Sequence, residues 1–185
     1  MDMRMIGGAV VLAVVTVVTA VAQVPPRAVA VRTNPDATVP GMMARLIDWG
    51  GTTVPDGQQC NQFGGQGSTP RLALDGYHTG TQVILLAFND ETYAPMNNGG
   101  HGIVGFRING RYASTGSIPG ETQPNSQGNL IVADNRGGQS PGYLPPCSGG
   151  RGNLYSVTVM AVTWADTNPP SYTVLNQTRV ELGRY

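Results

Sequence analysis

The chain has 185 residues, the size of one domain, and its 11 basic residues balance 11 acidic residues, so the formal net charge is zero. No run of basic residues occurs, which argues against nucleic acid as a partner. All the basic residues are Arg, which excludes chemistry that depends on Lys, such as a Schiff base or a P-loop lysine.

The first 22 residues have the pattern of a secretory signal. Arg4 precedes an apolar stretch from Ile6 to Val21, and small residues up to Ala22 form a cleavage site. The apolar stretch is shorter than the about 20 residues that a membrane-spanning helix needs. We therefore expect cleavage near Ala22 and a protein secreted to the periplasm or outside the cell, with no transmembrane span in its mature form. An uncleaved membrane anchor is the alternative.

Residues 23–41 contain four Pro and only short apolar alternation, which is typical of a flexible lead. A single domain is expected over residues 42–185. Its composition, with 26 Gly and 14 Pro in the whole chain and a hydrophobic share of 40%, favours a turn-rich protein with a core.

The domain is predicted to be mainly β. Seven short segments are rich in Val, Ile, Leu and Tyr and are bounded by Gly, Pro or Asn, as strands are. No apolar period of 3.6 residues is sustained after the signal, so helices should be few and short. The expected strands are residues 44–49, 71–74, 82–89, 103–109, 129–133, 154–164 and 172–183.

Two long loops are expected, over residues 110–128 and 134–152, and loops of this length are often functional. The second contains a Gly-x-Ser-x-Gly pattern around Ser140, which in hydrolases presents a serine nucleophile between a strand and a helix. The Pro- and Gly-rich residues that follow cannot begin such a helix. Both histidines also precede Ser140, whereas that fold places its His last, so a serine hydrolase is disfavoured.

His101 is the histidine with a candidate role, because it directly precedes a predicted strand and follows the acidic pair Asp90 and Glu91 by ten residues. Strand pairing can bring the imidazole and a carboxylate together. A structural histidine is the alternative that the sequence leaves open. His78 lies in a turn-like stretch and is expected to be an exposed loop residue.

The two cysteines are expected to form a disulfide. Export exposes Cys60 and Cys147 to an oxidising compartment, and a tetrahedral metal needs more ligands than two Cys and two His at unrelated spacings provide. We expect no metal and no cofactor.

Five motifs follow one another along residues 44–164. TVP at 53–55 precedes Cys60 and GSTPRLAL at 67–74, VILLAFNDETYAP at 83–95 precedes His101, and GYLPPC at 142–147 precedes NLYSVTVMA at 153–161. In this order they resemble the phosphatidylethanolamine-binding protein family, in particular its bacterial secreted branch, and VELGRY at 180–185 continues the resemblance weakly. The resemblance implies a β-sandwich with Greek-key connections in which the C-terminal helical segment of the family is reduced.

The resemblance also implies a small ligand cavity at the edge of the sandwich. In this alignment Glu91 and Tyr93 stand in place of two Asp, Gly102 in place of a Trp, and Asn153 in place of a second His. The expected role of Glu91 is to orient the imidazole, and Tyr93 is expected to fill part of the cavity. The ligand-binding residues implied are Glu91, Tyr93, His101, Pro146 and Asn153.

The function expected from this resemblance is non-catalytic binding of a small anionic ligand, a phospholipid headgroup or a partner protein. Members of the family also inhibit proteases or kinases through loops, so an inhibitor-type interaction protein is the first alternative. A hydrolase that uses Ser140, or Glu91 with His101, is a weaker alternative. Replacement of a titratable His by Asn153 predicts weakened anion binding, because charge-assisted hydrogen bonds are the stronger kind.

Overall fold

The computed structural model describes residues 41–108, 113–123 and 129–185. The expected signal, residues 1–22, and nearly all of the expected lead lie outside the described residues. The described residues form strands and two short 3-10 turns, which confirms the prediction of an all-β fold. Neither turn has the length or the apolar character of a membrane-crossing helix, nor does any other described segment form such a helix.

The strands closely follow the segments that the sequence predicts, except for β5, a pair of residues too short to be recognised. No helix follows β7 in residues 166–185, where β8 lies instead. The elements are β1 (Met43–Leu46), η1 (Asn61–Phe63), β2 (Leu72–Asp75), β3 (Val83–Asp90), η2 (Ala94–Met96), β4 (Ile103–Arg107), β5 (Ala113–Ser114), β6 (Asn129–Ala133), β7 (Leu154–Ala165) and β8 (Ser171–Arg184).

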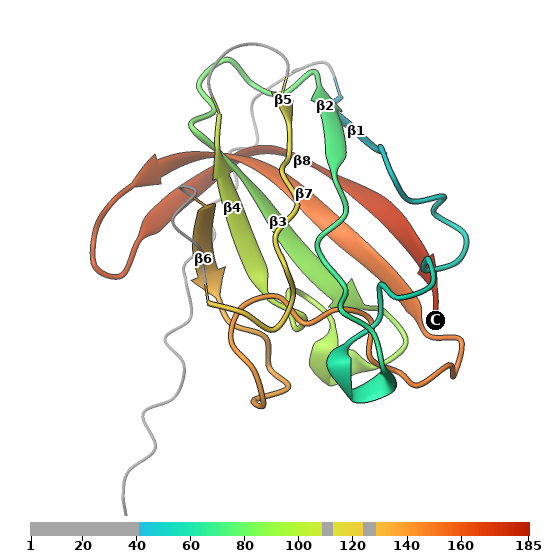
Figure 1. The fold of residues 1–185 in the computed structure, drawn as a ribbon. Coiled ribbons are helices and arrows are strands. Elements are labelled where there is room, and N and C mark those ends of the chain that lie inside the picture. The colour runs from blue at the N-terminus through green and yellow to red at the C-terminus, as the bar shows by residue number, and fades with distance from the viewer. Residues whose placement is uncertain (1–40, 109–112, 124–128) are drawn as a thin grey trace, which may run out of the picture.

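Two antiparallel sheets build the domain (Figure 1). The large sheet has the order β6-β4-β3-β7-β8, and the small sheet has the order β1-β2-β5. The chain passes from the small to the large sheet between β2 and β3, returns between β4 and β5, and crosses again before β6. Both 3-10 turns and the loop over residues 134–152 gather at the lower end of the view in Figure 1.

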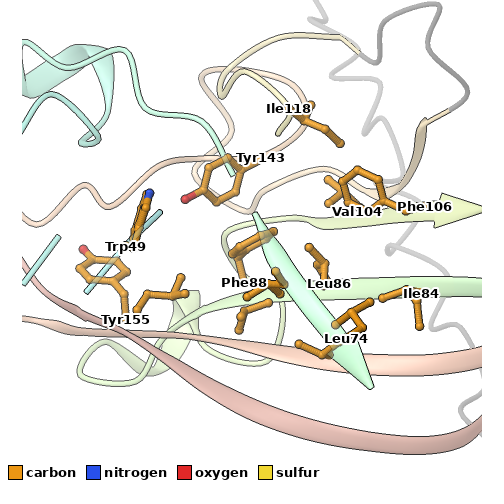
Figure 2. Close-up of a cluster of buried hydrophobic side chains, with 14 of the residues drawn as sticks. Trp49, Leu74, Ile84, Leu86, Phe88, Val104, Phe106, Ile118, Tyr143 and Tyr155 are labelled. Atoms are coloured by element: carbon orange, nitrogen blue, oxygen red, sulfur yellow. The ribbon is translucent and has the colours of Figure 1, made fainter. Parts of the chain in front are cut away.

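Strand β3 is the centre of the core, because all eight of its residues are buried. Ile84, Leu86 and Phe88 face the small sheet, where Figure 2 shows them among residues that include Leu74 and Tyr143. The alternate residues Val83, Leu85 and Ala87 join a second cluster with β7 and β8 on the opposite face. Full burial of side chains of this size stabilises a fold by roughly 1.5–3 kcal/mol each.

The alternation of β3 continues beyond its apolar residues and separates two neighbouring acidic side chains. Asp90 is in phase with Phe88 and lies toward the interior, whereas Glu91 follows the phase of the opposite face. This alternation decides which carboxylate belongs to the candidate site.

The predicted disulfide between Cys60 and Cys147 is confirmed, with the Cα atoms 5.3 Å apart. It connects the residue that precedes η1 to the loop over residues 134–152. The backbone N–H of Cys60 also donates to the carbonyl of Pro146 at 3.1 Å. Two segments far apart in the chain are therefore joined at one end of the sandwich.

Candidate functional site

A cavity of about 960 Å³ lies where the two 3-10 turns, the loop over residues 134–152 and the ends of β3 and β7 meet. Its volume is in the range of sites that hold a small organic ligand. Polar side chains from separate parts of the chain line it, among them Asp90, Tyr93, His101, Arg151, Asn153 and Tyr155.

Asp90 has hydrogen-bond partners on both of its carboxylate oxygens. One carboxylate oxygen accepts from the backbone N–H groups of Thr92 and Tyr93 at 2.9 and 3.0 Å, and the other accepts from the Asn153 amide at 2.6 Å. The side chain is 3% exposed. A buried carboxylate with several donors is held in one orientation, so Asp90 is a fixed acceptor at the cavity wall.

His101 is also buried, at 3% exposure, and its ring is held from two sides. Nδ1 lies 2.8 Å from the carbonyl oxygen of Leu144, which can only accept, so Nδ1 carries the proton. The ring also meets Tyr155 edge-on, with centroids 5.3 Å apart. Burial lowers the pKa of His101, and the carbonyl of Leu144, the Asp90 charge and the carbonyl of Pro145 offset only part of this. The imidazole is therefore neutral at pH 7, with a lone pair on Nε2.

Tyr155 connects the disulfide loop to Asp90. It is the cross-strand partner of Asp90 in the large sheet, and its hydroxyl accepts the backbone N–H of Cys147 at 3.1 Å. Burial raises the pKa of Tyr155 to about 12, and hydrogen bonds link the hydroxyl to Ser148 and to Asp90. The phenol therefore stays protonated at any physiological pH and serves as a neutral hydrogen-bonding group.

Two predicted site residues lie elsewhere. Glu91 is on the opposite face of the large sheet, where it accepts from Ser156 at 2.5 Å and binds Arg179 through both oxygens. It does not orient His101, because strand alternation turns its side chain away from the cavity. Pro146 lies beside His101 behind the wall, in a small void rather than in the cavity. The carboxylate at the cavity is therefore that of Asp90 and not, as predicted, that of Glu91.

The other three predicted residues do come together. Tyr93, His101 and Asn153 all line the cavity. Tyr93 is 56% exposed and lies at the rim, so it does not fill the space as the sequence analysis expected. Asn153 directly precedes β7, and its side-chain amide donates a hydrogen bond to Asp90.

The sequence did not predict Arg151 or Tyr155 as residues of the cavity, and it offered Asp90 only as a member of the acidic pair with Glu91. The signal for Asp90 was the strand period, since it shares the phase of three buried apolar residues. Arg151 is exposed, and its guanidinium has no hydrogen-bond or ion-pair partner among the described residues. Nothing in the Gly-rich sequence around it predicts its position at a cavity.

Ser140 lines the same cavity, but the surroundings of a serine nucleophile are missing. Residues 138–142 form bends and residues 143–147 have no regular secondary structure, and no hydrogen bond joins the Ser140 hydroxyl to His101 within the described parts of the chain. The turn is instead held by the amide of Asn135, which donates to the carbonyls of Ser140 and Gly142. No group of three metal-ligating side chains gathers among the described residues either.

Comparison with known proteins adds no identification, since neither a protein-family model nor a curated protein matches the chain.

Proposed function

We propose that this protein is exported and that it binds a small phosphate-bearing headgroup in the cavity without catalysis, as members of the phosphatidylethanolamine-binding protein family do. The observation that supports this proposal is the convergence of Asp90, His101 and Asn153, from three separate segments, on one cavity. The disulfide is compatible with an extracytoplasmic location.

The charges of the cavity favour a zwitterionic headgroup over a simple anion. Arg151 offers to a phosphate a guanidinium with which no described residue pairs, whereas the carboxylate groups of Asp90 and Glu121 face the same space. A neutral His101 brings no positive charge at pH 7 to offset them. Phosphoethanolamine carries both an ammonium group and a phosphate, so it can meet both kinds of partner.

The test is calorimetric titration of phosphoethanolamine, ethanolamine and inorganic phosphate at about pH 5.5 and 7.5, on either side of the ordinary pKa of imidazole. Phosphoethanolamine should bind more tightly than either fragment. Phosphate binding should strengthen as the pH falls through the lowered pKa of His101, because a protonated His101 adds a charge and a second donor.

Two variants make the test specific. Arg151→Gln should weaken the binding of phosphoethanolamine. Asn153→His should strengthen this binding at the lower pH by about 1 kcal/mol, the gain from a charge-assisted hydrogen bond. Gln177→His, on the exposed edge strand β8, is the matched control for the added histidine and should change nothing. If wild type and Asn153→His bind none of the three compounds at either pH, the proposal is wrong.

A further inference from the structure

The disulfide is part of the cavity wall. Asn61 and Gln62, which follow Cys60 directly, line the cavity, and Cys147 lines it from the opposite segment. The bond between Cys60 and Cys147 therefore joins two pieces of the wall that are 87 residues apart in the chain.

The two cysteines of the disulfide differ in solvent exposure. Cys60 is 0% exposed, whereas Cys147 is half-buried and borders the cavity. The side-chain oxygen of Gln62 lies 4.0 Å from Cys147 Sγ, so this side chain is next to the sulfur that an entering thiol must approach. A thiolate can attack a disulfide only at a sulfur that it can reach. Of the two cysteines, Cys147 lines the cavity and Cys60 does not.

We infer that Cys147 is a site of thiol–disulfide exchange with small thiols that enter the cavity. The thiolate of the entering compound forms a bond to Cys147 Sγ as the bond between Cys147 and Cys60 breaks. The electron pair of that bond goes to Cys60 Sγ, which takes a proton from water. The products are a mixed disulfide on Cys147 and a buried thiol at Cys60, with glutathione as the representative co-reactant.

The exchange alters the cavity in two ways. The adduct occupies space next to the Cys147 backbone N–H, which donates to Tyr155, and Tyr155 in turn contacts Asp90. The segment with Asn61 and Gln62 loses its covalent connection to the loop and is then held by hydrogen bonds, among them those from the Cys60 N–H to the Pro146 carbonyl and from the Asn61 N–H to the Glu121 carboxylate. Exchange should therefore prevent headgroup binding, a consequence that rests on the proposed function. The inference that exchange occurs at Cys147 and not at Cys60 does not rest on the proposed function.

The experiment treats the folded, oxidised protein with glutathione, quenches it with acid and maps the peptides by mass spectrometry. Cleavage after Arg71, Arg136 and Arg151 places the two cysteines on different peptides. The adduct should lie on Cys147 in at least about tenfold excess over Cys60, as expected when access decides the rate. An adduct found mainly on Cys60, or equal amounts on both cysteines, would overturn the inference, as would an intact disulfide that forms no adduct.

Variants test access directly. Gln62→Ala should speed the exchange, whereas Gln177→Ala, an exposed glutamine of β8 away from the cavity, should not. In Cys60→Ala the remaining Cys147 thiol should react readily with iodoacetamide, and in Cys147→Ala the buried Cys60 should be protected. Equal alkylation rates in two folded variants would contradict the inference.

Titration of the isolated mixed disulfide with phosphoethanolamine separates the two proposals. Binding by the wild type and none by the adduct supports the link between exchange and ligand binding. If the wild type itself does not bind, the proposed function fails, while the peptide map still decides where exchange occurs.

Discussion

Removal of the disulfide by the double substitution Cys60→Ala and Cys147→Ala should destabilise the protein strongly. Alanine is chosen because a serine at position 60 would bury an extra hydroxyl in a site that is 0% exposed. The bond closes a span of 87 residues. In the chain-entropy model a loop of this length restricts the unfolded state by about 4.6 kcal/mol at 25 °C.

The assay is urea unfolding followed by tyrosine and tryptophan fluorescence, with the free energy of unfolding extrapolated to water. The double variant should lose about 4 kcal/mol and should show a steeper denaturant dependence, because its unfolded chain exposes more surface. Reduced wild type is the control and should resemble the variant. A loss below about 1 kcal/mol would show that this bridge does not restrict the unfolded chain as the model requires.

Three further predictions concern His101, the ion pair of Glu91 and a glycine of the turn at the cavity. Because burial lowers the pKa of His101, the unfolded state takes up the proton first, and stability should fall as the pH drops below about 6.5. When unfolding is measured at a series of pH values, the free energy of unfolding of His101→Gln should depend less on pH over this range than that of the wild type. An equal pH dependence in the two proteins would refute the assignment. Arg179→Gln should cost about 0.2–1 kcal/mol at pH 7, measured by urea unfolding, because the pair with Glu91 is partly exposed. Hydrogen bonding to Arg179 lowers the pKa of Glu91, so this cost should disappear as the pH falls through that lowered value, and a cost that persists in strong acid would have another origin. Gly142→Ala should destabilise the protein by more than about 1 kcal/mol, because φ is +68° and an added Cβ would lie 2.5 Å from a backbone oxygen. Gly138→Ala, with a similar φ and open space around it, should cost about 1 kcal/mol. Equal losses of thermal stability in the two variants would contradict this reasoning.

The fold was largely predictable because the strands of this protein differ from their connections in composition. β3 and β7 are rich in aliphatic residues and end at polar or Gly-rich segments, so their positions follow from local sequence. β5 has two residues and carries no such signal, since only pairing with β2 makes it a strand. The disulfide was predicted from the expectation of export and from the presence of only two cysteines.

The site was only partly predictable. His101 and Asn153 were found, but the choice between Asp90 and Glu91 depended on which side chain the strand turns inward. Arg151 could not be found at all, because tertiary contacts that include the disulfide loop bring its Gly-rich segment to the cavity. A sequence motif names residue types, whereas a cavity depends on orientations that the surrounding fold sets.

The central claim, that the cavity is a ligand site, is tested most directly by nuclear magnetic resonance of the amide-labelled protein during titration with phosphoethanolamine. The account predicts progressive shifts for the backbone amides of Thr92 and Tyr93, which donate to Asp90, and for the side-chain amide of Asn153. The exposed amide side chain of Gln177 on β8 should not shift. Shifts confined to β8 or to the small sheet, or no shifts at saturating ligand, would contradict the account.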